Sequence, residues 1–527
     1  MSKTVQAKAI ADEQKGNENS SKEASFDDLL VQFGVDASNA DASLLGLCRF
    51  LFSSLQAQKE QLSELNANIR DLISRLQESS NKNSKNSSLP PSKEGYKKPP
   101  ANKNTSLRQS SGKSPGAQEG HKGSGLKKVE ADEIIRKPHF NAACQGCPNF
   151  CECREKAKLI GVRHNYQLLL KVVDEQHEAY SLACPKFSGM ILEGSFPDTT
   201  KSVQQYGESM REMVIQLWAV GIVSIDRIQK IISERTGLGI STGTISSYVK
   251  EFAGKCDGIL PEISNFLKDA PVKGADETGI RAEGELQWIH TVCNESATYL
   301  YSRGKRGYDT VKEEGLLTTA SGIIIHDCLP MYFKLNNLQH GVCIQHLLRE
   351  TNAAKERSPE HADELSKISE LLREMKKAKE ERIAAGYDGF TSRTLKSYLT
   401  RYNKQLRKLL ELFPAPPKRK QGKQGRQAEG KTRSFLLRLK KHRDAVFLFA
   451  TNFKAWFTNN YSEISFRISK VKESVSKCFR KLTGLKQFIS IISVLDTAKK
   501  HGCKMSEFIR SVFRGEGKDL VSKMLFA

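Results

Sequence analysis

The fold is constrained most by two strand-like segments that each carry an acidic residue at one end. The first, ADETGIRAEGELQWIHTVCN, starts at Ala275 and alternates apolar and polar residues as a half-buried β-strand does. The second, SGIIIHD, is a short β-branched run that ends at Asp327, as expected of a buried strand with a carboxylate at its carboxyl end. These segments predict an α/β domain, because stretches with helical patterns flank them.

Asp276 and Glu277 lie side by side at the start of the first segment. A carboxylate at the edge of a buried strand is costly unless it pairs with a positive group or holds a cation. A solvated turn would explain the same two acids without any function. Because adjacent strand residues face opposite sides of a sheet, we expect Asp276 to carry the chemistry and Glu277 to support the site from the other side.

A third acid, Glu463, follows the Asn459-Asn460 turn at the start of a predicted helix, with Arg467 one turn along the same face. Carboxylates on two strands and a helix are the arrangement of ribonuclease H-like polynucleotidyl transferases. Two Mg²⁺ ions about 3.5–4 Å apart need several oxygen ligands, and together they stabilise the attacking and leaving oxygens of a displacement at phosphorus. Asp276, Asp327 and Glu463 are therefore the expected catalytic residues and the expected ligands of two Mg²⁺ ions.

The net charge of +23 is concentrated in three blocks. Residues 81–130, 418–443 and 467–486 carry net charges of +8, +10 and +6, so the rest of the chain is nearly neutral. A merely solvated surface would spread its charge evenly, whereas concentrated blocks favour a polyanion, and double-stranded DNA is the partner we expect. An anionic membrane is the weaker alternative, since no lipidation signal or amphipathic helix accompanies the blocks and no run approaches the ~20 apolar residues of a membrane span.

The first 130 residues predict an oligomerising helix between two disordered segments. Residues 1–43 are expected to be disordered, and they contain no secretory signal, which favours a cytoplasmic location with reduced cysteines. Residues 44–79 predict a coiled coil that makes a homo-oligomer, with an ordinary amphipathic helix packed on its own domain as the alternative. The apolar positions that recur there every seven residues are Leu55, Leu62, Ile69 and Leu76. Residues 80–130 predict a basic disordered linker.

Residues 131–200 form a cysteine-rich segment whose spacing is like that of a zinc ribbon. Cys144 and Cys147 make a CxxC knuckle, and Cys184 follows after a strand-like stretch. We expect these three residues to bind Zn²⁺. Phe187 breaks the second CxxC, so the fourth ligand stays open; reduced structural cysteines without a metal are the alternative. The candidates for the fourth ligand are Cys151, Cys153, His139 and water.

Residues 201–265 predict helices, with a helix-turn-helix pattern in IDRIQKIISERTGLGISTGTISSYVKEF. Gly237 and Gly239 mark the turn, and Ser241 or Thr242 would cap the second helix. A helical hairpin that binds nothing fits as well as one that reads DNA. The side chains available for reading DNA are Thr244, Ser246, Ser247 and Lys250. Residues 266–527 are expected to form the catalytic α/β domain, interrupted by a basic helical insertion at about 350–450.

The chain resembles the transposases of the insertion sequence 66 family over nearly its whole length. The motifs that carry the resemblance are NSSLPPS after the heptad helix, HKGSGL before the cysteines, ADETG…EGELQWIH, RG at 306–307, HDCLPMYF, VCIQHLLRE and FTNNYSEISFR…KVKESVSKCFR. The chain departs from the family pattern at Phe187 and at Ile464, where the family commonly has arginine beside its glutamate. Neither departure touches the three acids.

This resemblance implies a metal-dependent DDE-type transposase with a ribonuclease H-like catalytic domain. Such an enzyme cuts the ends of its own insertion sequence to leave 3′-hydroxyls, which then attack target DNA at phosphorus. Asp276, Asp327 and Glu463 match its acidic triad. Cys343 and His346 match a Cys-x-x-His element of this and related families. That element could hold a metal ion together with His340, or it could be a buried thiol and a histidine on a helix face.

The same interpretation implies DNA contacts and partners. The expected phosphate-binding residues are Arg467, Lys470, Lys472 and Arg480, and in the insertion Lys418, Arg419 and Lys420. The expected partners are the element ends, target DNA, further copies of the chain and small accessory proteins encoded by the same element, in a prokaryotic cytoplasm and associated with the nucleoid. Two alternatives are a structure-specific nuclease without strand transfer and a non-enzymatic DNA-binding regulator whose acids are only structural.

Overall fold

The computed structural model divides the chain into two units, Met1–Pro100 and Ala101–Ala527. The described residues are 26–34, 41–80, 134–160, 162–163, 170–184, 190–197, 200, 202–416 and 430–526. The first unit contains α2 (Phe26–Gln32) and the 39-residue helix α3 (Ala42–Ser80), which leaves the Leu55 and Leu62 side chains 64% and 63% exposed. The helix predicted at 44–79 is therefore present, and its pairing into a coiled coil remains a prediction. The predicted linker lies, apart from Ser80, outside the described residues.

The cysteine-rich segment contains two short helices and a hairpin. These are α4 (Ala142–Gln145), α5 (Phe150–Glu155) and the antiparallel strands β1 (Ser181–Cys184) and β2 (Met190–Glu193). Cys144 and Cys147 are exposed free thiols on and just after α4. Cys184 ends β1, but its side chain and Phe187 lie outside what the structure describes. The predicted zinc module thus remains a prediction.

A five-stranded mixed sheet forms the centre of the second unit, in the order β5-β4-β3-β6-β7. Its strands are β3 (Val272–Ala282), β4 (Glu285–Cys293), β5 (Thr298–Arg303), β6 (Ile323–His326) and β7 (Gln339–Val342). β3, β4 and β5 form an antiparallel meander, whereas β6 runs parallel to β3 and β7 runs parallel to β6. The two strand-like segments of the sequence are confirmed as parts of one α/β sheet. The structure corrects the first of them, because it forms two antiparallel strands, β3 and β4, and Asp276 lies inside β3 rather than at the start of a strand.

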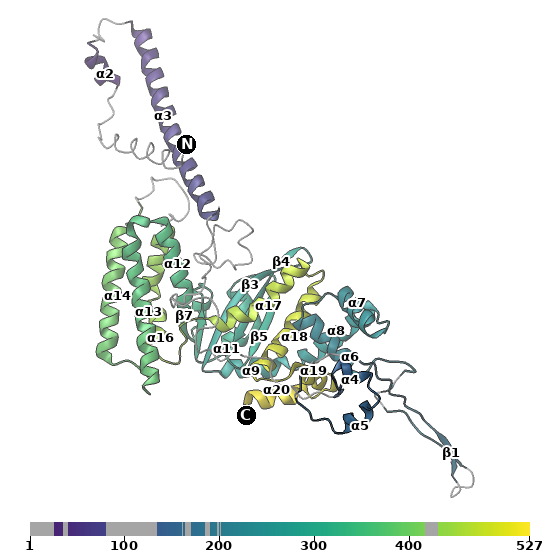
Figure 1. The fold of residues 1–527 in the computed structure, drawn as a ribbon. Helices are drawn as coiled ribbons and strands as arrows, with labels where there is room; N and C mark the ends of the chain where they lie inside the picture. Colours follow the sequence, from purple (N-terminus) through teal and green to yellow (C-terminus); the bar gives the residue numbers. More distant parts are fainter. Residues whose placement is uncertain are drawn as a thin grey trace. The chain divides into compact units, whose positions relative to one another are not determined.

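Helices cover both faces of this sheet (Figure 1). On one face α17 (Asn460–Ser476) packs on β3 and β4 and α18 (Leu482–Lys500) packs on β5, where Thr298 donates a hydrogen bond to Asp496 at 2.6 Å. The next residue of β5, Tyr299, donates to Glu314 of α10 (Tyr308–Glu314) at 2.5 Å. Because successive strand residues face opposite sides, α10 lies on the other face.

The helical segment predicted at 201–265 shares one apolar core with the sheet and with the C-terminal helices. It consists of α6 (Glu208–Ile215), η4 (Gln216–Val220), α7 (Ile225–Thr236), α8 (Thr242–Asp257) and α9 (Leu260–Asp269), and the C-terminal helices are α19 (Met505–Arg514) and α20 (Gly517–Phe526). Gly237 ends α7 in the left-handed conformation, and the Ser241 hydroxyl caps α8 by accepting the Thr244 N–H at 3.0 Å, as the sequence predicted. Ser246, Ser247 and Lys250 are exposed on α8, so DNA reading by this helix remains a prediction.

A helical insertion follows β7 and has a second apolar core, which includes Ile323 and Ile325 of β6. Its helices are α12 (Ile344–Arg357), η6 (Pro359–His361), α13 (Ala362–Ala384), α14 (Ser392–Leu412), α15 (Lys431–Lys441) and α16 (Arg443–Thr451). Figure 1 shows this bundle beside β7, and α16 packs on that strand. Lys418, Arg419 and Lys420 lie outside the described residues.

Two short elements, α11 (Leu316–Thr319) and η5 (Tyr332–Lys334), lie before and after β6. No helix in the described part of the chain has the length and apolar character needed to cross a membrane.

Candidate active site

Asp276 and Asp327 lie at the same level of the sheet because of how β3 and β6 pair. Val272 is opposite Ile323 and Gly274 is opposite Ile325, so partners in this parallel register are 51 residues apart. The same offset separates Asp276 from Asp327, two residues further on. β6 ends at His326, so Asp327 lies at its carboxyl end while β3 continues past it. The register therefore brings together the two acids that the sequence singled out.

The environment of Asp276 is strongly negative. Burial raises the pKa of Asp276 well above its usual range, and the charges of Asp327, Glu277 and Glu463 raise it further. The Glu277 N–H donates to Asp276 Oδ1 at 2.9 Å, which opposes that rise. On the second aspartate, Asp327 Oδ1 accepts the Leu329 N–H at 3.1 Å. Each aspartate thus has one oxygen held by a backbone amide.

Glu463 reaches this region because α17 begins against β3. The fully buried Asn459 donates from Nδ2 to the Ala275 carbonyl at 2.8 Å, and its own N–H donates to Cys343 Sγ at 3.2 Å. Ser462 donates to Asn459 Oδ1 at 2.8 Å. Asn459 therefore ties the first turn of α17 to the strand of Asp276 and to the residue that precedes α12.

Two basic side chains of α12 lie beside Glu463. His346 Nδ1 lies 3.9 Å from Glu463 Oε1, and an Arg349 nitrogen lies 3.6 Å from Oε2. In the described part of the chain, the group of three metal-capable side chains with ligand atoms all within 4.8 Å of one another is Cys343, His346 and Glu463. The three predicted catalytic acids do not form so tight a group.

His340 belongs to another cluster. Its Nδ1 lies 3.3 Å from His326 Nε2, and its Nε2 lies 3.0 Å from the Leu335 carbonyl oxygen. The structure thus corrects the expectation that His340 could join Cys343 and His346, because the third metal-capable side chain beside them is that of Glu463.

Glu277 is buried on the opposite face of β3 from α17. Its Oε1 accepts from Arg306 Nε at 2.7 Å, and its Oε2 accepts from the Tyr332 hydroxyl at 2.7 Å. The guanidinium of Arg306 lies over the Trp288 ring at 4.9 Å and reaches to 3.9 Å from Asp327 Oδ2. Burial, with the charge of Asp327 second, raises the pKa of Glu277. Glu277 thus holds the arginine that faces Asp327, the second of the predicted catalytic aspartates.

Sequence reasoning gave no role to Arg306, Trp288 or Tyr332. The signal was present, since all three lie in motifs that carry the family resemblance: RG, EGELQWIH and HDCLPMYF. Their connection to Glu277 is visible only in the folded sheet.

The predicted phosphate contacts on and after α17 separate into two kinds. Arg467 and Arg480 are exposed. Lys470 donates to the Gly279 carbonyl and to Glu473. Lys472 is buried with its ammonium 5.0 Å from the centre of the Trp218 ring, and burial lowers its pKa. This placement corrects the expectation that Lys472 is free to bind a phosphate, because its side chain packs in the core.

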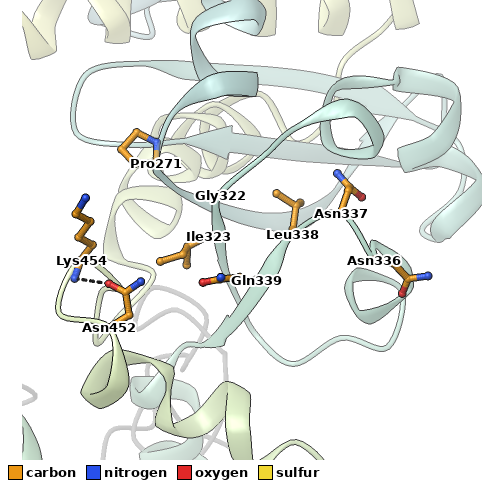
Figure 2. A pocket seen from close by; sticks show the side chains of 9 residues that line it. All are labelled: Pro271, Gly322, Ile323, Asn336, Asn337, Leu338, Gln339, Asn452 and Lys454. Atoms are coloured by element: carbon orange, nitrogen blue, oxygen red, sulfur yellow. Dashed lines mark hydrogen bonds between the residues drawn. The ribbon is translucent and has the colours of Figure 1, made fainter. Parts of the chain in front are cut away.

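A cavity of about 390 Å³ lies at the other end of the parallel strands (Figure 2). Gly322, Ile323 and Gln339, at the amino ends of β6 and β7, line it together with Asn452 and Lys454. None of the described residues that line this cavity has a carboxylate, thiol or imidazole side chain. It is therefore distinct from the acidic site, which lies at the carboxyl end of β6.

Comparison with known protein families gives two matches. The model of a family described as Transposase IS66 family matches residues 204–487, which is more than half of the chain and includes all three predicted catalytic acids. A family of unknown function (DUF6444) matches residues 47–127, the region of α3 and the predicted linker. No curated protein matches the chain.

Proposed function

The chain belongs to the IS66 family of transposases, and on that premise we propose that it cuts the ends of its own insertion sequence and joins the resulting 3′-hydroxyls to target DNA. The family implies a nucleotidyl-transfer enzyme that acts on DNA. The observation that supports the finer proposal is the convergence of Asp276, Asp327 and Glu463 from three distant segments, through the β3–β6 register and the docking of α17. We assign these three acids as the catalytic residues.

The proposed catalytic domain is ribonuclease H-like. Its support is the mixed sheet, in which Asp276 lies on the first strand of a meander, Asp327 follows a strand parallel to it, and Glu463 lies on a helix packed on the same strand. The domain boundaries predicted above, with the insertion between the second and third acids, are part of this proposal.

The donor atoms fit divalent cations. Mg²⁺ prefers carboxylate oxygens, and Asp276, Asp327 and Glu463 would hold two of these ions. The crowding of negative charge around Asp276 is the environment that a cation would neutralise. When bound, two such ions supply stabilisation of the attacking and leaving oxygens in a displacement at phosphorus.

Other parts of the chain would hold the DNA. Arg467 and Arg480 are exposed close to Glu463 in sequence and would neutralise phosphates, and the basic blocks outside the described residues would extend that surface. Self-association through α3 would hold two element ends together, and its exposed leucines support this part of the proposal. The proposal also includes zinc binding by Cys144, Cys147 and Cys184, and accessory proteins encoded by the same element.

The experiment is a reaction of the full chain with a plasmid that carries both element ends, taken from the DNA that flanks the gene. We expect Mg²⁺-dependent breaks at the ends and covalent joining of the 3′ ends to a second plasmid. Breaks without joining would favour a nuclease. Binding without metal-dependent breaks would favour a regulator.

A further inference from the structure

Three chemically different side chains meet beside the aspartate pair. The Cys343 sulfur, a ring nitrogen of His346 and a carboxylate oxygen of Glu463 all lie within 4.8 Å of one another. Cys343 is the N-cap residue of α12, His346 lies in the first turn of α12, and Glu463 lies in the first turn of α17. The group is therefore built on the starts of two helices.

Backbone hydrogen bonds hold these positions in place. The His346 N–H donates to the Cys343 carbonyl at 3.2 Å, and the Glu463 N–H donates to the Asn459 carbonyl at 3.3 Å. The Asn459 N–H donates to Cys343 Sγ at 3.2 Å. These bonds fix the starts of the two helices relative to each other, so that only the side chains need to move to act as one site.

One atom of the group lacks a partner. His346 Nδ1 is buried and makes no hydrogen bond, and Glu463 Oε1 lies 3.9 Å from it. A buried polar atom without a partner costs free energy, so such an atom in a native site points to a group that binds there. Arg349 contacts the other oxygen of Glu463, Oε2, which leaves Oε1 on the histidine side.

We propose that Cys343, His346 and Glu463 bind a Zn²⁺ ion. One sulfur, one nitrogen and one oxygen ligand form a set that Zn²⁺ accepts with a fourth position open, whereas Mg²⁺ takes oxygens. Bond lengths of about 2.0–2.3 Å place tetrahedral Zn²⁺ ligands ~3.3–3.7 Å apart, so the group must contract by roughly 1 Å. His346 and Glu463 are only partly buried and can make that movement. The thiol loses its proton to solvent as the Zn–S bond forms.

This site competes with the proposed catalytic function for one carboxylate. With Glu463 bound to Zn²⁺ beside α12, its carboxylate is withdrawn from Asp276 and Asp327. Zn²⁺ therefore inhibits Mg²⁺-dependent DNA cleavage, and more Mg²⁺ partly relieves the inhibition. This consequence rests on the proposed function, whereas the binding of Zn²⁺ does not.

Co²⁺ titration of the metal-free full chain tests the binding. Co²⁺ replaces Zn²⁺ and gives a thiolate charge-transfer band, which reports a Co–S bond directly. We expect Cys343→Ser to remove about one equivalent of thiolate-bound Co²⁺, whereas Cys478→Ser, which changes a thiol outside the group, keeps it. This difference separates the site from the cysteines of residues 131–200, which are intact in both variants.

Two further variants cover the other ligands. Since Cys343 is buried and its replacement could impair folding, His346→Gln and Glu463→Gln are titrated as well. Each should weaken Co²⁺ binding at the Cys343 thiolate at least about tenfold. Unchanged affinity in both variants would overturn the site.

Inhibition of DNA cleavage by Zn²⁺ tests the competition for Glu463 separately. Micromolar Zn²⁺ added with Mg²⁺ should slow cleavage by the wild type at least about tenfold, and should slow His346→Gln, relative to its own zinc-free rate, much less. Equal inhibition of both proteins would overturn the competition. If the chain cuts no DNA at all, the proposed function fails, and the Co²⁺ titration still decides the site.

Discussion

The Asn459 side chain occupies the space that a Cβ atom at Gly274 would need. A Cβ built there would overlap Asn459 Oδ1 and lie 2.7 Å from Ser462 Oγ. Helix α17 therefore approaches β3 at a point where the strand has no side chain. The position of Glu463 relative to Asp276 depends on this close approach.

Gly274→Ala should displace the start of α17 and with it Glu463. Overpacking of a tight contact typically costs about 1–3 kcal/mol, so we expect a loss of stability of that order in urea unfolding. Cleavage of element ends should fall by more than the loss of folded protein explains, because the third acid is misplaced. A variant with wild-type stability and wild-type cleavage would contradict this account of the helix–strand contact.

Gly279→Ala is the matched control on the same strand. A Cβ at Gly279 would have the flexible end of Leu286 at 3.1 Å and the Trp288 ring at 3.9 Å as its nearest neighbours, and both side chains belong to β4. We therefore expect a small change in stability and cleavage close to that of the wild type.

Replacement of the three acids should separate binding from chemistry. Asp276→Asn, Asp327→Asn and Glu463→Gln keep volume and remove the charge that would hold a divalent cation. Each should leave DNA binding nearly intact and abolish cleavage, since metal stabilisation of the transition state is worth several kcal/mol. A Glu463→Gln protein that cuts and joins ends at a near-normal rate would remove Glu463 from the assignment.

Glu277→Gln should be milder than any of these three changes. It removes the charged partner of Arg306 but keeps a side chain that can accept from Tyr332. We expect reduced stability, on the order of 1–3 kcal/mol for a weakened buried hydrogen bond to a charged group, with measurable cleavage. Complete loss of cleavage at full stability would mean that Glu277 itself takes part in the chemistry.

Local rules predicted the elements of this chain well. The alternation after ADETG corresponds to β3 and β4, and the isoleucine run corresponds to β6. Gly237 ends α7 and Ser241 begins α8, as capping preferences require. The pairing of β3 with β6 was beyond these rules, because a register depends on two segments at once. The 51-residue spacing of the aspartates gains its meaning only from that register.

Non-local contacts and an unusual helix account for what the sequence did not predict. Glu277 meets Arg306 and Tyr332, 29 and 55 residues away, and no local pattern encodes such pairs. α17 buries small polar residues, Ser462, Ser465 and Ser469, and exposes Ile464, Val471 and Val475. Lys472 lies on this buried polar face, although its place in the basic block 467–486 led to the expectation of a phosphate contact.

The salt dependence of DNA affinity should change when exposed positive side chains are replaced and should stay the same when a buried one is replaced. Each phosphate contact contributes about −0.9 to the slope of log affinity against log salt. Arg467→Gln combined with Arg480→Gln should flatten this slope by about 2 units. Lys472→Gln should leave the slope unchanged and lower stability instead, because its ammonium packs on Trp218. Equal slopes for the double variant and the wild type would exclude both arginines from the DNA interface.

Replacing Lys418, Arg419, Lys420 and Lys423 together with Gln tests the basic stretch of the insertion in the same assay. The expected flattening is up to about 3–4 units if all four contact phosphates. No change would exclude this stretch from the bound surface.

Without a bound metal ion, the charged Asp276 carboxylate should destabilise the folded protein. The pKa of Asp276 is raised in the folded state. Its carboxyl group therefore stabilises the fold fully below the ordinary aspartate pKa of about 3.9, and this stabilisation is lost as the pH rises through the raised pKa. At neutral pH in a chelator, Asp276→Asn should therefore be more stable than the wild type, although we expect it to be inactive. The exposed Asp388→Asn should change nothing.

Added Mg²⁺ should reverse which protein, the wild type or Asp276→Asn, has the higher melting temperature. A ligand that binds only the folded state stabilises it by mass action, so Mg²⁺ should raise the melting temperature of the wild type and have little effect on Asp276→Asn. Lowering the pH without metal should reduce the difference in melting temperature between the two proteins, since the Asp276 carboxyl of the wild type becomes protonated. If Asp276→Asn is the less stable protein in the chelator at neutral pH, the carboxylate is compensated within the chain, and the argument that this site needs a cation fails.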